Sequence, residues 1–427
     1  MSSALRSPVF VRVLFAGFVS DTGDWMLFVA LPLVVYRLTG SALGTSVAFL
    51  LELIPAVVLA PLTARLIAKI DRRRLLVAVS LVQAVAVAPL LLVRSADAVI
   101  VLYVVIVLQA SCSAIFEPAK DSWMPELVPA ERLVSANALI GLAQNVGRLV
   151  GGPLGGALLA FGRLDVVVVA DVASFLIAAA LLWSAPHDRR KVHEAAGNGA
   201  RPIADRRRSG VIRALRQPGL RATFVSVGLA AVSQGLFLVL FVLFVTGSLH
   251  GSDAEVGLLR GIQAVGSIAA GAALGLFAVA TRPRRLVMLG AVAFGVISLV
   301  VWNLPVLTIA SWPYVLLFVL VGAPGVLLST GYISLIQTAA GDRGSAFAAF
   351  GLVNAVGQGI GLLAAGLVQP GAGLLALLEV QGVLYLLAGV VMFQWRRPKG
   401  VLRTAAPPIG ATDASAHVES GPLRSTS

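Results

Sequence analysis

Charged side chains are scarce in this sequence. Only 12% of its 427 residues are Asp, Glu, Lys or Arg, and 58% are hydrophobic, whereas charged residues make up about 25% of an ordinary soluble domain. One soluble core could not bury that much apolar surface. Crossing the ~30 Å hydrocarbon layer of a bilayer takes roughly 20 apolar residues, and apolar runs of that length recur along the chain. The composition therefore predicts a polytopic membrane protein in contact with the lipid bilayer.

Cysteine, histidine and a nucleotide-binding loop are also missing or nearly so. Cys112 is the only cysteine, which excludes an intramolecular disulfide. The four histidines lie in loops and in the tail without the spacing of metal ligands, so we expect neither a metal site nor a cofactor. No Gly-rich loop ends in Gly-Lys-Ser/Thr. Transport would therefore draw on an ion gradient or on the gradient of the substrate itself.

Twelve apolar segments predict twelve transmembrane helices. Their approximate ranges are 11–36, 43–66, 75–93, 98–116, 137–161, 165–184, 221–246, 254–280, 286–302, 311–337, 343–368 and 372–395. The first is too long for the core of a signal peptide and is followed by further spans, so we expect it to be retained.

The Arg and Lys residues are distributed very unevenly between the loops. With the N-terminus in the cytoplasm, the cytoplasmic side collects 28 of them and the outer side three. Cytoplasmic loops of membrane proteins carry such an excess, so both termini are predicted to be cytoplasmic and the chain to lie in a bacterial-type inner (plasma) membrane. The net charge of +13 comes from these short loops, not from one basic face, so we expect no nucleic-acid partner.

The sequence repeats after 210 residues. Gly141, Gly147, Gly151 and Gly156 correspond to Gly351, Gly357, Gly361 and Gly366, which aligns the fifth predicted helix of one half with that of the other. The predicted fold is an all-α membrane protein of two pseudo-symmetric six-helix bundles, at 1–184 and 221–395. A basic cytoplasmic linker at 185–220 joins them, and a disordered tail follows at 396–427. Within the linker, 211–215 forms either a short interfacial helix or part of a disordered tether.

Four stretches carry a likeness to a known family. They are Asp21-Thr22-Gly23-Asp24-Trp25, the loop from Ala64 to Arg73, Phe116-Glu117-Pro118-Ala119, and Gly152-Pro153-Leu154-Gly155-Gly156. Together they resemble the major facilitator superfamily, and within it the drug and siderophore exporters that include enterobactin exporters and macrolide efflux proteins. The resemblance implies the major facilitator fold and secondary transport by alternating access.

The loop after the second helix resembles the gating motif of that family. Lys69, Arg72 and Arg73 retain its basic half, but Ala64 stands where the family has Gly and Ala68 where it has Asp. The family uses the Asp in a cytoplasmic charge network, so whether this altered loop still gates is open. The alternative is that the charges serve only to orient the loop toward the cytoplasm.

The fifth predicted helix resembles the antiporter motif of the family. Its small residues allow another helix to approach closely and its proline bends the helix. Ordinary small-residue packing is the alternative interpretation. The residues of this motif are Gly147, Gly151, Gly152, Pro153 and Gly156.

Ionisable residues inside spans cost roughly 3 kcal/mol or more near the bilayer centre and are functional candidates. Asp24, with Asp21 as helper, is the predicted proton-coupling site, because the two acids share one helix face; Glu52 and Glu379 are the next candidates. The alternative for Asp24 is a structural residue that bonds the backbone of a bent helix. Three further charged residues are expected to reach the interface, namely Asp171, Asp253 and Arg260.

Arg148 is predicted to face the central cavity, with a carboxylate or a substrate anion nearby. Its repeat mate is Gln358, which is also polar. Gln109, Gln263 and Gln358 either line a polar cavity or form hydrogen bonds between helices.

The sequence favours a secondary active transporter that exports a hydrophobic or amphipathic small molecule, of the drug, antibiotic or siderophore type, by proton antiport. The expected partners are this small molecule and protons, and the protein is expected to be a monomer and not an enzyme. An uptake symporter for a small nutrient is the first alternative. A membrane-embedded enzyme or a receptor is the second; no histidine lies in a predicted span for a hydrolase site.

Overall fold

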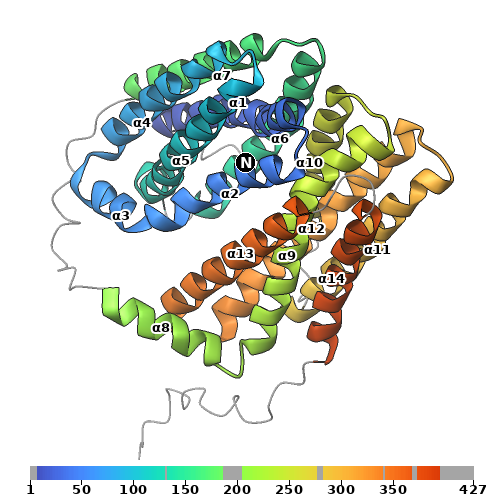
Figure 1. The fold of residues 1–427 in the computed structure, drawn as a ribbon. Coiled ribbons are helices and arrows are strands. Elements are labelled where there is room, and N and C mark those ends of the chain that lie inside the picture. Colours follow the sequence, from blue (N-terminus) through green and yellow to red (C-terminus); the bar gives the residue numbers. More distant parts are fainter. Residues whose placement is uncertain are drawn as a thin grey trace, which may run out of the picture. The chain divides into compact units, whose positions relative to one another are not determined.

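The computed structural model describes residues 7–129, 132–185, 204–276, 282–339, 342–367 and 373–394. The chain separates into two compact units, Met1–Gln394 and Trp395–Ser427. The predicted disordered tail lies outside the described residues. All that follows concerns the first unit (Figure 1).

The first half of this unit contains seven α-helices in the described residues. They are α1 (Pro8–Thr39), α2 (Ala42–Val58), α3 (Ala60–Lys69), α4 (Arg72–Val87), α5 (Val99–Leu127), α6 (Leu133–Ala160) and α7 (Leu164–Trp183). The second half contains α9 (Arg221–Leu243), α10 (Asp253–Leu276), α11 (Pro283–Asn303), α12 (Ser311–Ala339), α13 (Arg343–Gly366) and α14 (Leu374–Gln394). Helix α8 (Ala204–Arg216) precedes this second group.

Each of the twelve predicted ranges contains a helix. In the described part, ten helices are long and apolar enough to cross a membrane, and the bent pair α2–α3 brings the number to eleven if it counts as one span. The helix at the fifth predicted range, α6, is not among these eleven. The axes of α2 and α3 differ by 51°. Pro61, at the start of α3, explains the break, since proline cannot donate a backbone hydrogen bond and its ring clashes with the preceding turn.

The turn between α1 and α2 follows from three residues. Gly40 adopts a left-handed conformation with φ 63° and ends α1, and Ser41 caps α2 by accepting a hydrogen bond from the Gly44 backbone N–H. The same three-residue sequence, Thr-Gly-Ser, occurs at 39–41 and again after the first helix of the second half, but Thr246 to Ser248 lie in a π-helical turn, Phe244–Ser248, after α9. The sequence repeat is therefore not matched by an identical turn.

The helix packing repeats along with the sequence. A side chain at Gly151 of α6 would meet the backbone of Thr22 in α1, and one at Gly361 of α13 would meet the backbone of Val232 in α9. These positions are all related by the 210-residue offset. Helix α6 also packs on α10 of the other half, and α13 packs on α2. Each half thus contributes one long contact to the other.

Two predictions about the cytoplasmic side need correction. Lys120 was assigned to a loop after a fourth helix that ends at residue 116, but α5 continues to Leu127 and buries Lys120, whose exposed fraction is 3%. The excess of Arg and Lys on the predicted cytoplasmic side remains when Lys120 is left out of the count. The linker contains α8, which is longer than the expected 211–215 helix; its Val211 and Leu215 pack beside Phe350 and Val353 of α13.

The halves contact each other through the outer and middle thirds of their helices. Side chains at Gly156 or Gly257 would overlap the backbone of the opposite helix, so α6 and α10 touch at van der Waals distance. By contrast, a side chain added at Gly141, Gly271 or Gly351, near the ends of α6, α10 and α13 that are predicted to be cytoplasmic, would meet no neighbour within 4 Å. The glycines are thus closely packed toward the predicted outer end and not at these positions toward the predicted cytoplasmic end.

Candidate functional site

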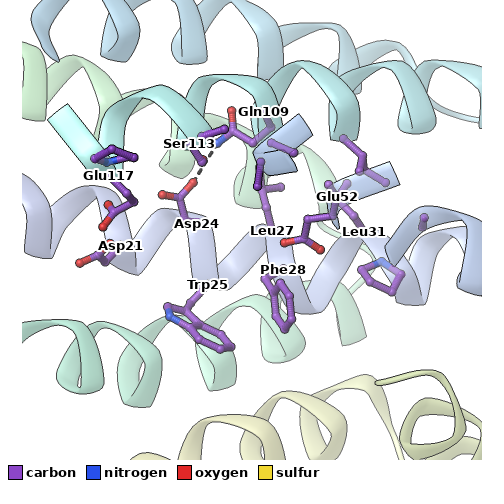
Figure 2. Close-up of a pocket in the computed structure, with 17 residues that line it drawn as sticks. Asp21, Asp24, Trp25, Leu27, Phe28, Leu31, Glu52, Gln109, Ser113 and Glu117 are labelled. Carbon is purple, nitrogen blue, oxygen red and sulfur yellow. Dashed lines mark hydrogen bonds between the residues drawn. The ribbon is translucent and has the colours of Figure 1, made fainter. Parts of the chain in front are cut away.

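A cavity of about 600 Å³ lies in the first half of the unit. Three helices, α1, α2 and α5, supply all the residues that line it. Four carboxylic acids and two aromatic rings face it, and most of the remaining wall is aliphatic (Figure 2). The acids are Asp21, Asp24, Glu52 and Glu117, and the rings are Trp25 and Phe28.

Helical periodicity brings these residues to one face. On α1 the lining positions are 21, 24, 25, 27, 28, 31 and 32, on α2 they are 48, 52 and 56, and on α5 they include 106, 110, 113 and 117. Residues three or four apart stack on the same side of an α-helix. Each of the three helices therefore contributes one face to the cavity wall.

Three carboxylates line one end of the cavity, and one buried ammonium group lies beside them without lining it. Asp24 accepts a hydrogen bond of 2.8 Å from the amide of Gln109. Glu117 forms a 2.7 Å ion pair with the buried Lys120, one turn later on α5, and Lys120 also attracts Asp21. Since one ammonium group faces three acids, this end is left with excess negative charge.

Glu117 and Lys120 are functional candidates that sequence reasoning missed. Their i, i+3 spacing on either side of Pro118 is the signature of a helical ion pair. The predicted range, 98–116, ends just before these charged residues. An ion pair inside a helix keeps a charged segment within the membrane-spanning bundle.

Asp171 does not reach the interface, contrary to the prediction. It is fully buried on α7 against Gly23 of α1, where a side chain would overlap it. Ser174 donates a 3.4 Å hydrogen bond to its Oδ1, and its Oδ2 has no partner in the part of the chain that the structure describes. It does not line the cavity, but Asp24, the neighbour of Gly23 on α1, repels it electrostatically.

The aromatic wall of the cavity is backed by two arginines. The rings of Trp25 and Phe28 meet edge to face, with centroids 4.8 Å apart. The guanidinium of Arg148 lies 4.8 Å from the Trp25 centroid, and that of Arg260 lies 5.4 Å from the Phe28 centroid. Neither arginine lines the cavity, so the rings stand between the cavity and the two cations.

Arg148 joins α6 to α10 across the contact between the halves. It donates a 2.6 Å hydrogen bond to the side chain of Gln263 and a 3.3 Å bond to the backbone carbonyl of Arg260. The structure thus places Arg148 behind the cavity wall, without the adjacent carboxylate that was expected. Gln263 is buried and bonds between helices, whereas Gln109 lines the cavity.

The two other sequence candidates lie elsewhere. Glu379 occupies the first turns of α14, half-buried, and Gln358 lies on α13, where its backbone carbonyl packs against Gly235 of α9. Neither lines the cavity. The structure therefore gathers Asp21, Asp24 and Glu52 from the four proton-coupling candidates and leaves Glu379 apart.

At the end predicted to be the outer one, an ion pair connects the halves. Arg37, near the end of α1, lies 2.5 Å from Asp253, the first residue of α10, and donates a hydrogen bond to the Leu159 carbonyl of α6. Asp253, which was predicted to reach the interface, is 4% exposed and is paired with Arg37. Arg260 is also buried, with 6% of its surface exposed.

Two basic residues of the predicted gating loop, Arg72 and Arg73, contact helix ends on the side that is predicted to be cytoplasmic. Arg72 pairs with Glu126 of α5 at 3.4 Å. Arg73 donates hydrogen bonds to the carbonyls of Leu182 and Trp183, the last residues of α7, and stacks on the Trp183 ring. Lys69 ends α3, and Ala64 and Ala68 on the same helix are exposed.

The residues of the predicted antiporter motif serve two interfaces. Gly147 and Gly151 face α1, where Asp21 and Thr22 lie. Gly152, Pro153 and Gly156 face α10 of the other half. These contacts fit close helix packing, and an antiport role for the motif stays a prediction.

No cluster of three or more His, Cys, Asp or Glu that could hold a metal ion occurs among the described residues. The four cavity acids lie spread along its wall, with Glu52 at the opposite end from Asp21 and Glu117 (Figure 2). This arrangement suits an elongated organic molecule that carries a charged group.

The model of the Major Facilitator Superfamily matches residues 13–244 of this chain. The chain is 28% identical over 421 residues to the multidrug efflux pump Tap of Mycolicibacterium fortuitum, an alignment that covers 92% of this chain and 96% of Tap. It is 28% identical to the uncharacterized MFS-type transporter YfiS of Bacillus subtilis (strain 168), over only 40% of either protein.

Solved transporter structures share the fold at low sequence identity. A bacterial homologue of the iron transporter ferroportin in an inward-facing state superimposes with a TM-score of 0.69 at 18% identity, covering 92% of this chain and 99% of the homologue. The nucleoside transporter NupG gives a TM-score of 0.72 at 11% identity, covering 91% of this chain and 100% of NupG.

Proposed function

Because this chain belongs to the major facilitator superfamily and is a transporter of that fold, we propose that it exports amphipathic, cationic small molecules in exchange for protons. The observation that carries the proposal is the cavity, in which four acids and two aromatic rings share a mostly aliphatic wall. Ligand pockets of this kind fix an apolar body by contact and orient it by a few polar groups.

The charge of the cavity supports a cationic substrate. Asp21, Asp24 and Glu117 face a single ammonium group, that of Lys120. An anionic group placed beside them would be repelled in a medium of low dielectric constant, whereas a cation would be attracted. The aromatic and aliphatic residues provide the surface for the rest of the molecule.

The same carboxylates support proton exchange. An ionised acid in a membrane-spanning helix is costly unless a cation or a proton neutralises it. Asp24 can therefore hold either a proton or the charged group of the substrate, but gains little from both at once. Competition between the two for one carboxylate is sufficient to couple the export of one to the entry of the other.

Two observations support export over uptake. The relative that covers most of this chain is named as a multidrug efflux pump. The glycine faces of the two halves are filled at the outer end and open at the end that the charge pattern assigns to the cytoplasm, so this conformation suits loading from the cytoplasm.

The proposal is tested in inside-out vesicles with an acidic lumen, prepared from cells without their own efflux pumps. Tetraphenylphosphonium and tetraphenylborate have the same shape and opposite charges, and valinomycin with potassium removes the membrane potential. We expect the protein to accumulate the phosphonium in the lumen and not the borate. Equal handling of both ions would contradict a cationic substrate, and accumulation only in right-side-out vesicles would favour the uptake symporter.

A further inference from the structure

Arg260 is a buried charge at the contact between the two halves. It lies on α10 in the second half, 6% exposed. Its guanidinium sits 4.9 Å from the ring centroid of Phe237 and 5.5 Å from that of Phe241, both on α9, in addition to the Phe28 ring of α1. A buried cation needs an anion nearby, because aromatic rings offset only part of its lost hydration.

Glu52 is a carboxylate that attracts Arg260 electrostatically. It lies on α2 of the first half and faces the cavity. No hydrogen bond or ion pair joins it to Arg260 directly. Phe28, which contacts the guanidinium, also lines the cavity beside Glu52 (Figure 2), and Phe49, one turn before Glu52, packs on Phe28 at 5.8 Å.

The surroundings leave Glu52 no other compensating charge. The remaining charged groups of its cavity are acids, on α1 and α5. The helices α3, α9 and α13, which also pack on α2, carry charges only near their ends, and Arg260 is the one charge that acts on Glu52. Those end charges are Arg65, Lys69, Arg221 and Arg343.

Arg148 makes the balance more sensitive. It lies beside Arg260 on the facing helix and repels it. Arg260 is therefore attracted by Glu52, which lines the cavity and is accessible there to a proton or a substrate. It is repelled by Arg148, which does not line the cavity. Neutralising Glu52 would leave two like charges together in the contact between the halves.

We propose that Arg260 senses the charge of the cavity: its attraction to the ionised Glu52 keeps α10 against α1, and neutralisation of Glu52 by a proton or a bound cation releases α10 and opens the outer end. The proposal rests on the export function proposed above, and it adds the residue pair that transmits occupancy to the contact between the halves. The outer contact to be released includes the Arg37–Asp253 pair and the close packing of α6 on α10.

The experiment measures the separation of the outer ends without requiring transport. Cys112 is the only cysteine, so Cys112→Ala gives a background for two spin labels. Phe161, after α6, and Val306, after α11, are 81% and 84% exposed and belong to opposite halves. Double electron–electron resonance between labels at these positions reports the populations of closed and open outer ends.

We expect Glu52→Gln to raise the ratio of open to closed outer ends by about tenfold or more, because it leaves a buried cation uncompensated. Glu52→Gln combined with Arg260→Gln should return the ratio to that of the wild type, since neither charge then remains. Glu52→Asp should stay closed. Asp165→Asn is the matched control: it removes an exposed acid, paired with Arg163, far from the cavity.

Two results would overturn the sensor. One is a Glu52→Gln distance distribution identical to that of the wild type; the other is a double variant as open as Glu52→Gln alone. If Glu52→Gln is not recovered as a folded protein, tetraphenylphosphonium added to the wild type must open the outer end and fail to do so in Arg260→Gln. A failed vesicle experiment with the distance shift intact would contradict the exporter alone, and successful export without any shift would contradict the sensor alone.

Discussion

Asp24 has the least compensation of the acids at its end of the cavity. Its one hydrogen bond comes from the neutral Gln109, and the single ammonium nearby is already paired with Glu117. Asp21, by contrast, is attracted by Lys120, and this attraction is the main interaction that favours its ionised form. The two acids of the Asp-Thr-Gly-Asp stretch share a helix face, but their surroundings give them different roles.

We therefore expect Asp24→Asn to abolish accumulation driven by a pH gradient while substrate binding persists, and Asp21→Asn to reduce accumulation only partly. The asparagine keeps the shape and the bond to Gln109 but cannot exchange a proton. Accumulation of tetraphenylphosphonium in inside-out vesicles and its equilibrium binding to purified protein measure the two effects. Accumulation by Asp24→Asn equal to that of the wild type would place the proton site at another carboxylate, with Glu52 the first to test.

Among the helices, equivalent arginines stabilise equivalent ends. Arg73, in the first turn of α4, donates to the carbonyls that end α7, and Arg284, in the first turn of α11, donates to those of Met392 and Phe393 that end α14. Unpaired carbonyls and the negative end of the helix dipole both favour a cation there. The basic turns that orient the protein in the membrane thus also connect the first and last turns of neighbouring helices.

Replacing either arginine with alanine should lower the melting temperature by a similar amount, corresponding to about 1–3 kcal/mol for hydrogen bonds to a charged group. Arg74→Ala is the control, since it removes an exposed arginine of the same turn for which no side-chain bond is found. Thermal unfolding in detergent, followed by the fluorescence of a thiol or tryptophan probe, measures the shifts. A loss for Arg74→Ala as large as for Arg73→Ala would show that the effect is one of net charge.

At the scale of the whole molecule, one end of the bundle is joined and the other is not. The Arg37–Asp253 pair and the glycines of α6 and α10 connect the halves at the end assigned to the outside. This assignment depends on the loop charges, which are 27 against three once Lys120 is left out. The interpretation of the conformation as open to the cytoplasm therefore depends on the orientation of the chain in the membrane.

Reporter fusions test that orientation. We expect a reporter that is active only in the cytoplasm to work when fused after Arg208 or at the C-terminus, and a periplasmic reporter to be inactive at both sites, because Arg and Lys are retained on the cytoplasmic side. Fusions after Arg163, in a predicted outer loop, should give the reverse result and serve as the control. A periplasmic signal after Arg208 would mean that the chain has the opposite orientation in the membrane. The substrate would then be loaded from the outside in this conformation.

Local features of the sequence determined much of the fold. Apolar length and loop charge are properties of single segments, which is why all twelve helix positions and the 210-residue repeat could be predicted and are matched by helices and by the paired contacts of Gly151 and Gly361. Helix periodicity likewise placed Asp21 and Asp24 on one face, and both line the cavity.

Only the tertiary structure decided which polar residues meet. Lys120 looked like a loop residue because its burial depends on an ion pair within α5. Arg148 was predicted to face the cavity, and Arg260 and Asp171 to reach the interface, yet Arg148 bridges the halves, Arg260 is enclosed by three rings and Asp171 is buried against α1. The physical reason is that helix packing sets the direction and the neighbours of each side chain, and these contacts join residues far apart in the sequence, such as Arg148 and Gln263, which are 115 positions apart.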